Sequence, residues 1–213
     1  MALAVKICGL STPESVDAAV DGGARFVGFV FFPPSPRYVA PGSATELTRR
    51  VPRSVARVAV TVDPTDDELA TILDVAEIDM VQLHGRETPE RTAEIKSRFG
   101  RPVIKAISVA AEQDLDAVND YASVADMILF DAKATKDDVL PGGNARTFDW
   151  RLLSGRTPRN VWFLSGGLNR ENLASAVRES GATHVDVSSG IESSRGIKDV
   201  GLIKSFLAAA NEI

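Results

Sequence analysis

Short apolar runs alternate with polar, helix-like segments along the whole chain. Each apolar run is rich in valine, isoleucine or phenylalanine, which is typical of strands that are covered on both faces in a parallel sheet. These runs predict strands at residues 5–7, 25–32, 55–62, 79–83, 102–107, 127–130, 161–164 and 184–187.

A helical segment follows each predicted strand. Thr12, Pro13 and Glu14 predict the start of the first helix, because proline fits the first turn and the helix dipole favours an acidic side chain there. Thr65, followed by acidic residues, predicts another start. The other predicted helices lie at about 42–51, 88–98 and 111–121, from near Phe148, from a cap at Asn169 to about Ser180, and at about 199–210.

This order of elements predicts the fold class. Eight consecutive strand–helix units indicate an α/β protein with a single (β/α)8 TIM barrel over residues 1–213. An open, doubly wound sheet is the alternative, but eight units in sequence favour closure. No linker or break in composition divides the chain, and its length of 213 residues suits one domain.

Charge and composition narrow the class of partner. The 24 lysine and arginine residues face 29 acidic residues and no basic cluster stands out, so nucleic acid is not an expected partner. No apolar stretch reaches the ~18 residues of a membrane span and the N-terminus lacks a signal-peptide pattern, so we expect a cytoplasmic protein without membrane contact. The single cysteine excludes an internal disulfide and a cysteine-rich metal site.

Polar residues follow many of the predicted strands. In a barrel of parallel strands the carboxyl ends of all strands meet at one mouth, where active sites of this fold lie. A lone cysteine is more commonly a small buried apolar residue, and a strand-end acid commonly bonds loop amides, so one such residue indicates little. The set that would converge at the mouth is Cys8, Arg37, His84, Asp131, Ser165, Asp186 and Ser188.

Two glycine-bearing turns follow the last two predicted strands. They are Ser165-Gly166-Gly167 and Ser188-Ser189-Gly190. Glycine lets a backbone approach an anion closely, and barrels of this kind commonly hold a phosphate between these two loops. Either turn alone would be read as a tight connection only. Their occurrence in both expected places predicts a phosphate site.

A set of longer strings carries a family resemblance. The strings are KICGL (6–10), FVFF (29–32), SPRY (35–38), VQLHG (81–85), LFD (129–131), TFDW (147–150), LSGGL (164–168) and VDVSSGIE (185–192). In content and order they resemble the phosphoribosylanthranilate isomerases of tryptophan biosynthesis. The resemblance runs from the first strand to the last.

The resemblance implies a reaction and its acid and base. The reaction is an Amadori rearrangement, in which the aminoaldose N-(5-phosphoribosyl)anthranilate becomes the aminoketose 1-(2-carboxyphenylamino)-1-deoxyribulose 5-phosphate. Cys8 takes the position of the general base and Asp131 that of the general acid. No metal or other cofactor is implied, because the nitrogen of the substrate serves as the electron sink.

The resemblance also implies how this phosphosugar substrate is bound. Arg37 takes the position that binds the anthranilate carboxylate, which suits a planar guanidinium. Asp186 is expected to contact the sugar or the anthranilate nitrogen. The residues expected to surround the phosphate are Gly166, Gly167, Ser188, Ser189 and Gly190.

Three points stay open at this stage. A thiol with the ordinary pKa of about 8.5 is only slightly ionised at neutral pH, and Lys6 is expected to lie one layer too deep to help Cys8. His84 has no assigned role, since a structural hydrogen bond explains it equally well. Ala145 stands where the family commonly has a glycine in the loop before Phe148, which would strain a positive φ there.

Two other functions compete with this one. A different phosphosugar barrel, such as indole-glycerol-phosphate synthase, would use a strand-end lysine, and Lys105 keeps that alternative open. A non-catalytic phosphoribosyl-binding barrel is the other. The sequence leaves a monomer and a homodimer equally possible, and does not decide whether a second aminoaldose is also a substrate.

Overall fold

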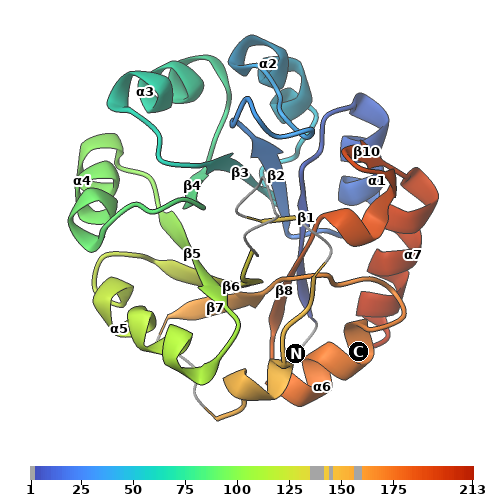
Figure 1. Ribbon diagram of the computed structural model, residues 1–213. Helices are drawn as coiled ribbons and strands as arrows, with labels where there is room; N and C mark the ends of the chain where they lie inside the picture. The colour runs from blue at the N-terminus through green and yellow to red at the C-terminus, as the bar shows by residue number, and fades with distance from the viewer. Residues whose placement is uncertain (1–2, 135–141, 144–145, 156–159) are drawn as a thin grey trace.

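The protein folds into a closed barrel of eight parallel strands (Figure 1). The computed structural model describes residues 3–134, 142–143, 146–155 and 160–213. The strands follow one another around the barrel in chain order, and β8 pairs with β1 to close it, which confirms the predicted (β/α)8 barrel. The strands are β1 (Ala4–Cys8), β2 (Phe26–Val30), β3 (Ala56–Thr61), β4 (Met80–Leu83), β5 (Val103–Val109), β6 (Met127–Ala132), β7 (Val161–Leu164) and β8 (His184–Val187).

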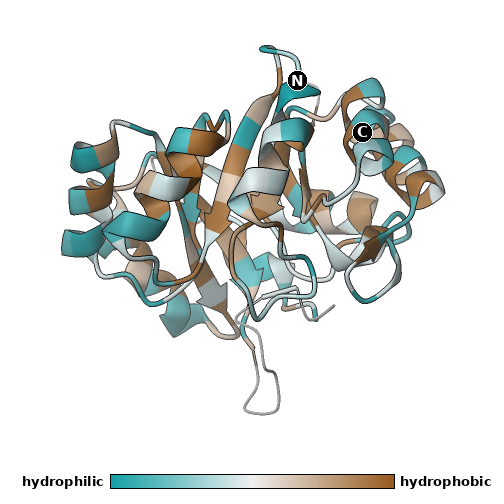
Figure 2. Cartoon of the chain, turned by 90° about the horizontal axis from the view of Figure 1, so that it is seen from above, coloured by the Kyte–Doolittle hydropathy of each residue, from teal (hydrophilic) through white to brown (hydrophobic). Residues whose placement is uncertain are grey.

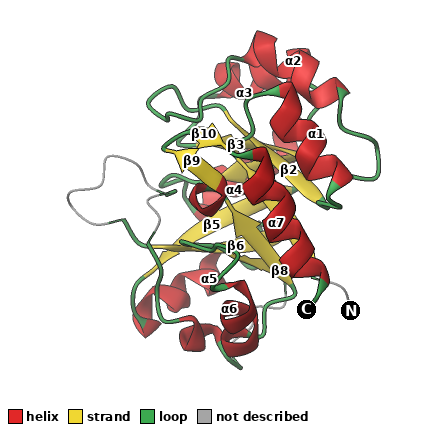
Figure 3. Ribbon diagram, turned by 90° about the vertical axis from the view of Figure 1, so that its right-hand side faces the viewer, coloured by secondary structure: helices red, strands yellow, loops and turns green. Residues whose placement is uncertain are grey.

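Helices surround the barrel. The α-helices are α1 (Pro13–Asp21), α2 (Pro41–Arg49), α3 (Asp66–Val75), α4 (Pro89–Phe99), α5 (Val118–Tyr121), α6 (Leu173–Ser180) and α7 (Val200–Asn211). Thr12, Thr65 and Thr88 cap α1, α3 and α4, each by accepting a backbone N–H with its side chain. Figure 3 shows α7 beside α1, so the last helix packs against the first and closes the outer ring.

Two predicted helices are shorter or tighter than expected. Residues 111–121 form the 3₁₀ helix η1 (Glu112–Ala117) followed by the short helix α5. Asp114 accepts the amides of Ala110 and Ala111, and this local bonding favours a tight 3₁₀ start over a regular α-helix. The helix expected near Phe148 is the 3₁₀ helix η2 (Trp150–Leu153).

The segments after β7 and β8 also differ from the prediction. Helix α6 begins at Leu173 and not directly after Asn169, because Asn169 and Asn172 exchange side-chain hydrogen bonds with each other's amides in the turn between. After β8 the chain forms the 3₁₀ helix η3 (Ser189–Ile191) and a two-stranded hairpin of β9 (Glu192–Ser194) and β10 (Ile197–Lys198). The sequence did not predict this hairpin.

Strand side chains alternate between the barrel interior and the layer beneath the helices. On β5, Ile104 and Ala106 belong to the interior cluster, whereas Val103 packs in the outer layer. Figure 2 shows hydrophobic residues gathered between the barrel and the helices, with hydrophilic residues on the outer helix faces. Within the described residues, no helix has the length and apolar character needed to cross a membrane.

Candidate active site

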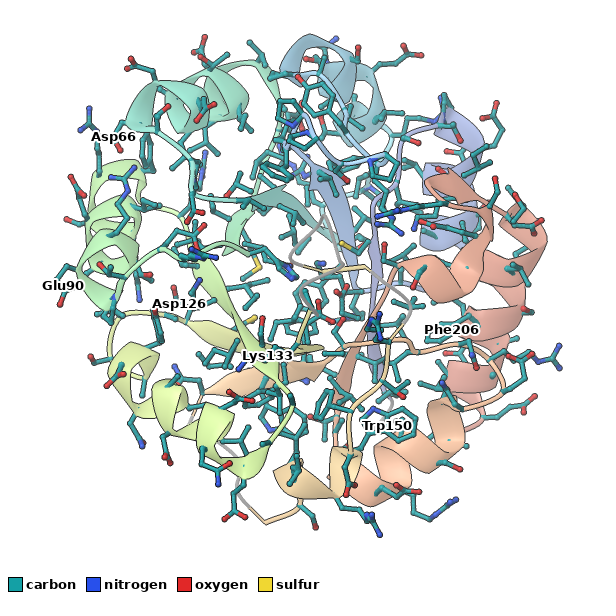
Figure 4. All side chains as sticks on the ribbon, viewed as in Figure 1. Asp66, Glu90, Asp126, Lys133, Trp150 and Phe206 are labelled. Atoms are coloured by element: carbon teal, nitrogen blue, oxygen red, sulfur yellow. The ribbon has the colours of Figure 1, made fainter. Side chains whose placement is uncertain are left out.

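A pocket opens at the mouth formed by the carboxyl ends of the strands. Figure 4 shows the side chains on the ribbon in the view of Figure 1, which looks along the barrel. The structure brings together residues that lie far apart in the sequence. Of those predicted for the mouth or the site, the pocket is lined by Cys8, Arg37, His84, Asp131, Ser165, Gly166, Gly167, Asp186, Ser188 and Ser189.

Gly190 is the predicted site residue that does not line this pocket. A Cβ at Gly190 would lie 1.9 Å from the carbonyl oxygen of Leu168. Only glycine therefore lets the loops after β7 and β8 approach each other this closely. Gly190 supports the turns after β7 and β8, and it does not itself line the pocket.

The turn after β7 has the backbone that an anion site needs. Gly166 and Gly167 have φ of 88° and 61°, and a Cβ at either would lie within 2.8 Å of a neighbouring backbone atom. Among the described residues, the amides of Gly166, Gly167 and Ser189 have no hydrogen-bond acceptor. Free amides beside a pocket can bind a phosphate. The two turns therefore have the features predicted for a phosphate site.

Cys8 ends β1 beside a buried ion pair. Lys6, on the same inward face, donates to Asp186 of β8 at 2.8 Å, and both side chains are buried. A Cβ built on Gly28 of β2 would lie 3.1 Å from the Cys8 sulfur and 3.2 Å from the Lys6 side-chain nitrogen. The thiol and the ammonium therefore lie close to the same point. The expectation that Lys6 lies too deep to act on Cys8 is wrong, because its long side chain carries the ammonium toward the thiol.

Opposing influences act on the Cys8 thiol. Burial raises its pKa above the ordinary value, and the charge of Asp186 acts in the same direction. The positive charges of Lys6 and Lys198 lower the pKa, since they stabilise the thiolate. The influence of burial prevails, so the pKa of Cys8 lies above its ordinary value, and the two lysines limit this rise.

Asp131, at the end of β6, is held by two partners. Its Oδ1 accepts the Ala132 amide at 3.0 Å, and its Oδ2 lies 3.1 Å from Nε2 of His84. The other ring nitrogen of His84 lies 2.8 Å from Nε2 of Gln82. With the Gln82 amide donating to Nδ1, the ring proton is on Nε2 and points at Asp131. The open question about His84 thus has a structural answer: it contacts the predicted acid.

Arg37 enters the pocket wall already oriented by Glu192. Its Nε and Nη2 donate to the two Glu192 carboxylate oxygens at 2.6 and 2.9 Å, and Nη2 also donates to the Gly143 carbonyl at 3.2 Å. Lys198 donates to the same carboxylate at 2.7 Å and to the Ser188 carbonyl at 2.8 Å. The hairpin β9–β10 therefore fixes the guanidinium plane of Arg37 at the pocket.

Glu192 is expected to stabilise the fold even at moderately acidic pH. Burial would raise the pKa of Glu192, but the hydrogen bonds and charges of Arg37 and Lys198 lower it from 4.5 to about 2. A lowered folded-state pKa stabilises the fold above the ordinary pKa, and that gain is lost as pH falls through the folded value. Glu192→Gln is therefore expected to unfold at lower urea than wild type at neutral pH, with a difference that shrinks between pH 4.5 and 2. A constant difference over this range would contradict the assignment.

Lys105, which kept one competing function open, does not line the pocket. Its ammonium binds Glu87 at 2.7 Å and the Gly85 carbonyl at 2.8 Å, on the outer side of the barrel wall. The alternative function, a different phosphosugar barrel with a strand-end lysine, therefore loses the lysine that supported it.

Some residues of the site were missed by the sequence analysis. Glu192 was part of a quoted string but received no role, and Lys198 was not singled out. Glu192 binds Arg37, which lies 155 residues earlier, so no local pattern marked it. Lys198 binds Glu192 across the hairpin β9–β10, and the sequence did not predict this hairpin. Ala145, the departure from the family pattern, lies outside the described residues.

The comparison with known families agrees with this geometry. The family model described as N-(5'-phosphoribosyl)anthranilate (PRA) isomerase matches residues 5–209. The chain belongs to the phosphoribosylanthranilate isomerase family. The isomerase of Paracoccus denitrificans is 56% identical over 210 residues, covering 99% of this chain and 98% of the relative. That of Rhodospirillum centenum is 52% identical over 211 residues, with 99% of each chain covered.

Solved phosphoribosylanthranilate isomerases have the same fold. The enzyme of Thermotoga maritima is 37% identical with a TM-score of 0.88, covering 99% of this chain and all of that one. An isomerase solved with reduced 1-(o-carboxyphenylamino)-1-deoxyribulose 5-phosphate is 35% identical with a TM-score of 0.86, at the same coverage. The chain is therefore an isomerase of tryptophan biosynthesis, as its motifs predicted.

Proposed function

We propose that the pocket converts N-(5-phosphoribosyl)anthranilate into 1-(2-carboxyphenylamino)-1-deoxyribulose 5-phosphate, with Cys8 as general base and Asp131 as general acid. One observation carries this assignment: the single thiol and a buried carboxyl group line the same pocket, although they lie on β1 and β6. Proton transfer by positioned side chains is the catalysis that an aldose–ketose shift needs.

Ring opening is the first step. Asp131, protonated, gives its proton to the ring oxygen as the bond between C1 and that oxygen breaks. The nitrogen lone pair forms the C1–N double bond, which yields a protonated Schiff base and leaves Asp131 as a carboxylate. The Ala132 amide and the Nε2–H of His84 then stabilise the carboxylate, since both point at its oxygens.

Proton removal from C2 is the second step. The Cys8 thiolate takes this proton, and the electrons of the C–H bond form a C1–C2 double bond and neutralise the nitrogen. The resulting enolamine becomes the ketose when C1 gains a proton and the C2 hydroxyl loses one. Lys6 favours the thiolate that this step requires, because its charge lowers the pKa of Cys8.

The remaining residues of the pocket bind the two ends of the substrate. Arg37 binds the anthranilate carboxylate with a guanidinium that Glu192 holds in place. The turns with Gly166, Gly167 and Ser189 bind the phosphate through free amides. Asp186 faces the sugar between these ends, and its bond to Lys6 holds it in place.

The test of this function is turnover of the expected substrate. The purified chain is mixed with freshly made phosphoribosylanthranilate, and the ketose is followed by NMR. We expect the substrate to be converted to the ketose without any added metal or cofactor. Release of free anthranilate without ketose would contradict the proposal, since it would indicate spontaneous hydrolysis only.

A base that must stay a free thiol suits a reducing compartment, so we place the enzyme in the cytoplasm.

A relative from Thermotoga maritima is described as a dimeric isomerase, and a homodimer is the state we test first. Sedimentation at several concentrations distinguishes the dimer from a monomer.

A further inference from the structure

A buried ion pair lies behind the turn that carries His84. Lys105 of β5 and Glu87 after β4 are 3% and 4% exposed, and their charged groups are 2.7 Å apart. Lys105 points away from the barrel interior, since its neighbours Ile104 and Ala106 belong to the interior cluster. The proposed reaction uses neither residue, so their burial needs another explanation.

The Lys105 ammonium binds the chain on both sides of His84. Besides Glu87, it donates to the Gly85 carbonyl at 2.8 Å and approaches the Leu83 carbonyl at 3.5 Å. An ammonium has three donors, and all three are directed to residues 83–87. The backbone that carries the imidazole is therefore fixed before and after it.

The Glu87 carboxylate ties the same turn to its neighbours. Oε1 accepts the Asp63 amide at 2.8 Å, and the two oxygens accept the Gly85 amide at 3.1 and 3.0 Å. Asp63 in turn accepts the Arg86 amide at 2.6 Å, and the Tyr121 hydroxyl donates to the Glu87 carbonyl at 2.8 Å. The turn is thus held from β5, from the loop after β3 and from α5.

Stability alone does not explain charges at this position. Removing two charges from water costs several kcal/mol per ion, and well-packed apolar residues in place of a buried pair are commonly as stable or more so. The outer layer nearby is apolar, with Leu83 and Val103 buried. A pair retained there is better explained by the groups that it positions.

We propose that Lys105 and Glu87 are positioning residues for the general acid. They hold residues 83–87 so that Nε2 of His84 stays 3.1 Å from Asp131, with Gln82 fixing the other ring nitrogen. Neither residue touches the substrate, and both act through His84. This inference rests on the proposed function, because it takes Asp131 as the acid.

The first test is Lys105→Met. We expect kcat to fall roughly 10-fold, because even a misplacement of about 1 Å at a catalytic group can cost 10²-fold. We expect KM to stay within about 2-fold, because the phosphate turns follow β7 and β8, and this split differs from a general loss of fold. An unchanged kcat in a folded Lys105→Met would overturn the inference.

The second test is a double-mutant cycle with His84→Ala. If Lys105 acts through His84, adding Lys105→Met to His84→Ala causes no further loss of kcat. Losses that multiply would show independent action and overturn the inference. Where Lys105→Met does not fold, Glu87→Gln, which keeps the shape and loses the charge, takes its place in the same cycle with the same two outcomes.

A second ion pair, partly exposed and far from the mouth, serves as the control that separates positioning from stability. Arg57 pairs with Asp79 at 2.7 Å at the opposite, amino-terminal end of β3 and β4. Arg57→Met is expected to lower Tm without changing kcat, and an equal fall in kcat there would overturn the inference. Full turnover in Asp131→Asn would instead end the assignment of Asp131 as the general acid, the part of the proposed function on which this inference rests. Normal kcat in Lys105→Met beside an inactive Asp131→Asn would end this inference alone.

Discussion

Cys8→Ser is expected to lower kcat at least ~10²-fold, the lower end for loss of a general acid or base. Serine has nearly the same shape, but its hydroxyl does not ionise near neutral pH, so the proton on C2 stays in place. Binding of a reduced product analogue, measured by calorimetry, is expected to stay close to that of wild type. A variant with near-normal kcat would refute the assignment of Cys8 as the base.

Lys6→Met is the companion variant for this prediction. It keeps the thiol but removes a charge that lowers the pKa of Cys8, and it leaves Asp186, which raises that pKa, without its partner. The alkaline limb of kcat/KM and the rate of alkylation by iodoacetamide are expected to move to higher pH. Because Cys8 is the single cysteine of the chain, alkylation reports on this thiol alone.

Asp131→Asn is expected to cost a similar factor, at least ~10²-fold in kcat. The amide keeps the size of the carboxyl and can still accept the Ala132 amide, but it has no acidic proton to give to the ring oxygen. The loss is therefore expected in ring opening, while the affinity for the reduced product analogue stays similar. Single-turnover NMR of the substrate separates the steps.

A bypass substrate sharpens the test of Asp131. An analogue that is already ring-opened needs no proton on the ring oxygen. Asp131→Asn is expected to act on it with a much smaller deficit, whereas Cys8→Ser is not. Equal losses of the two variants on such an analogue would contradict the division of roles between Asp131 and Cys8.

The fold was predictable because a short apolar run in the sequence marks each strand. The apolar run 55–62 contains the observed β3, and the run 127–130 lies within β6, since a strand covered on both faces is mostly apolar. Helix starts at Thr12 and Thr65 were equally local, because a cap depends on the next three residues. The α-helix predicted over 111–121 was wrong for a local reason as well. Asp114 accepts the Ala110 amide, and the segment forms the 3₁₀ helix η1.

The site was predictable only in part. Cys8 and Asp131 stand at strand ends, where the barrel brings them to one mouth, so topology alone places them. The contact between Arg37 and Glu192 joins the loop after β2 to the hairpin after β8, and no period or spacing in the sequence encodes it. Lys6 was misjudged because the depth of a Cα on its strand says little about the reach of a lysine side chain.

The seam between β1 and β8 has a consequence for synthesis on the ribosome. Lys6 is translated 180 residues before Asp186, the acid that neutralises it across the seam. Until then a charged side chain has no partner in the core that it will enter. Partial barrels formed during translation therefore cannot close, and the barrel is completed only after β8 has left the ribosome.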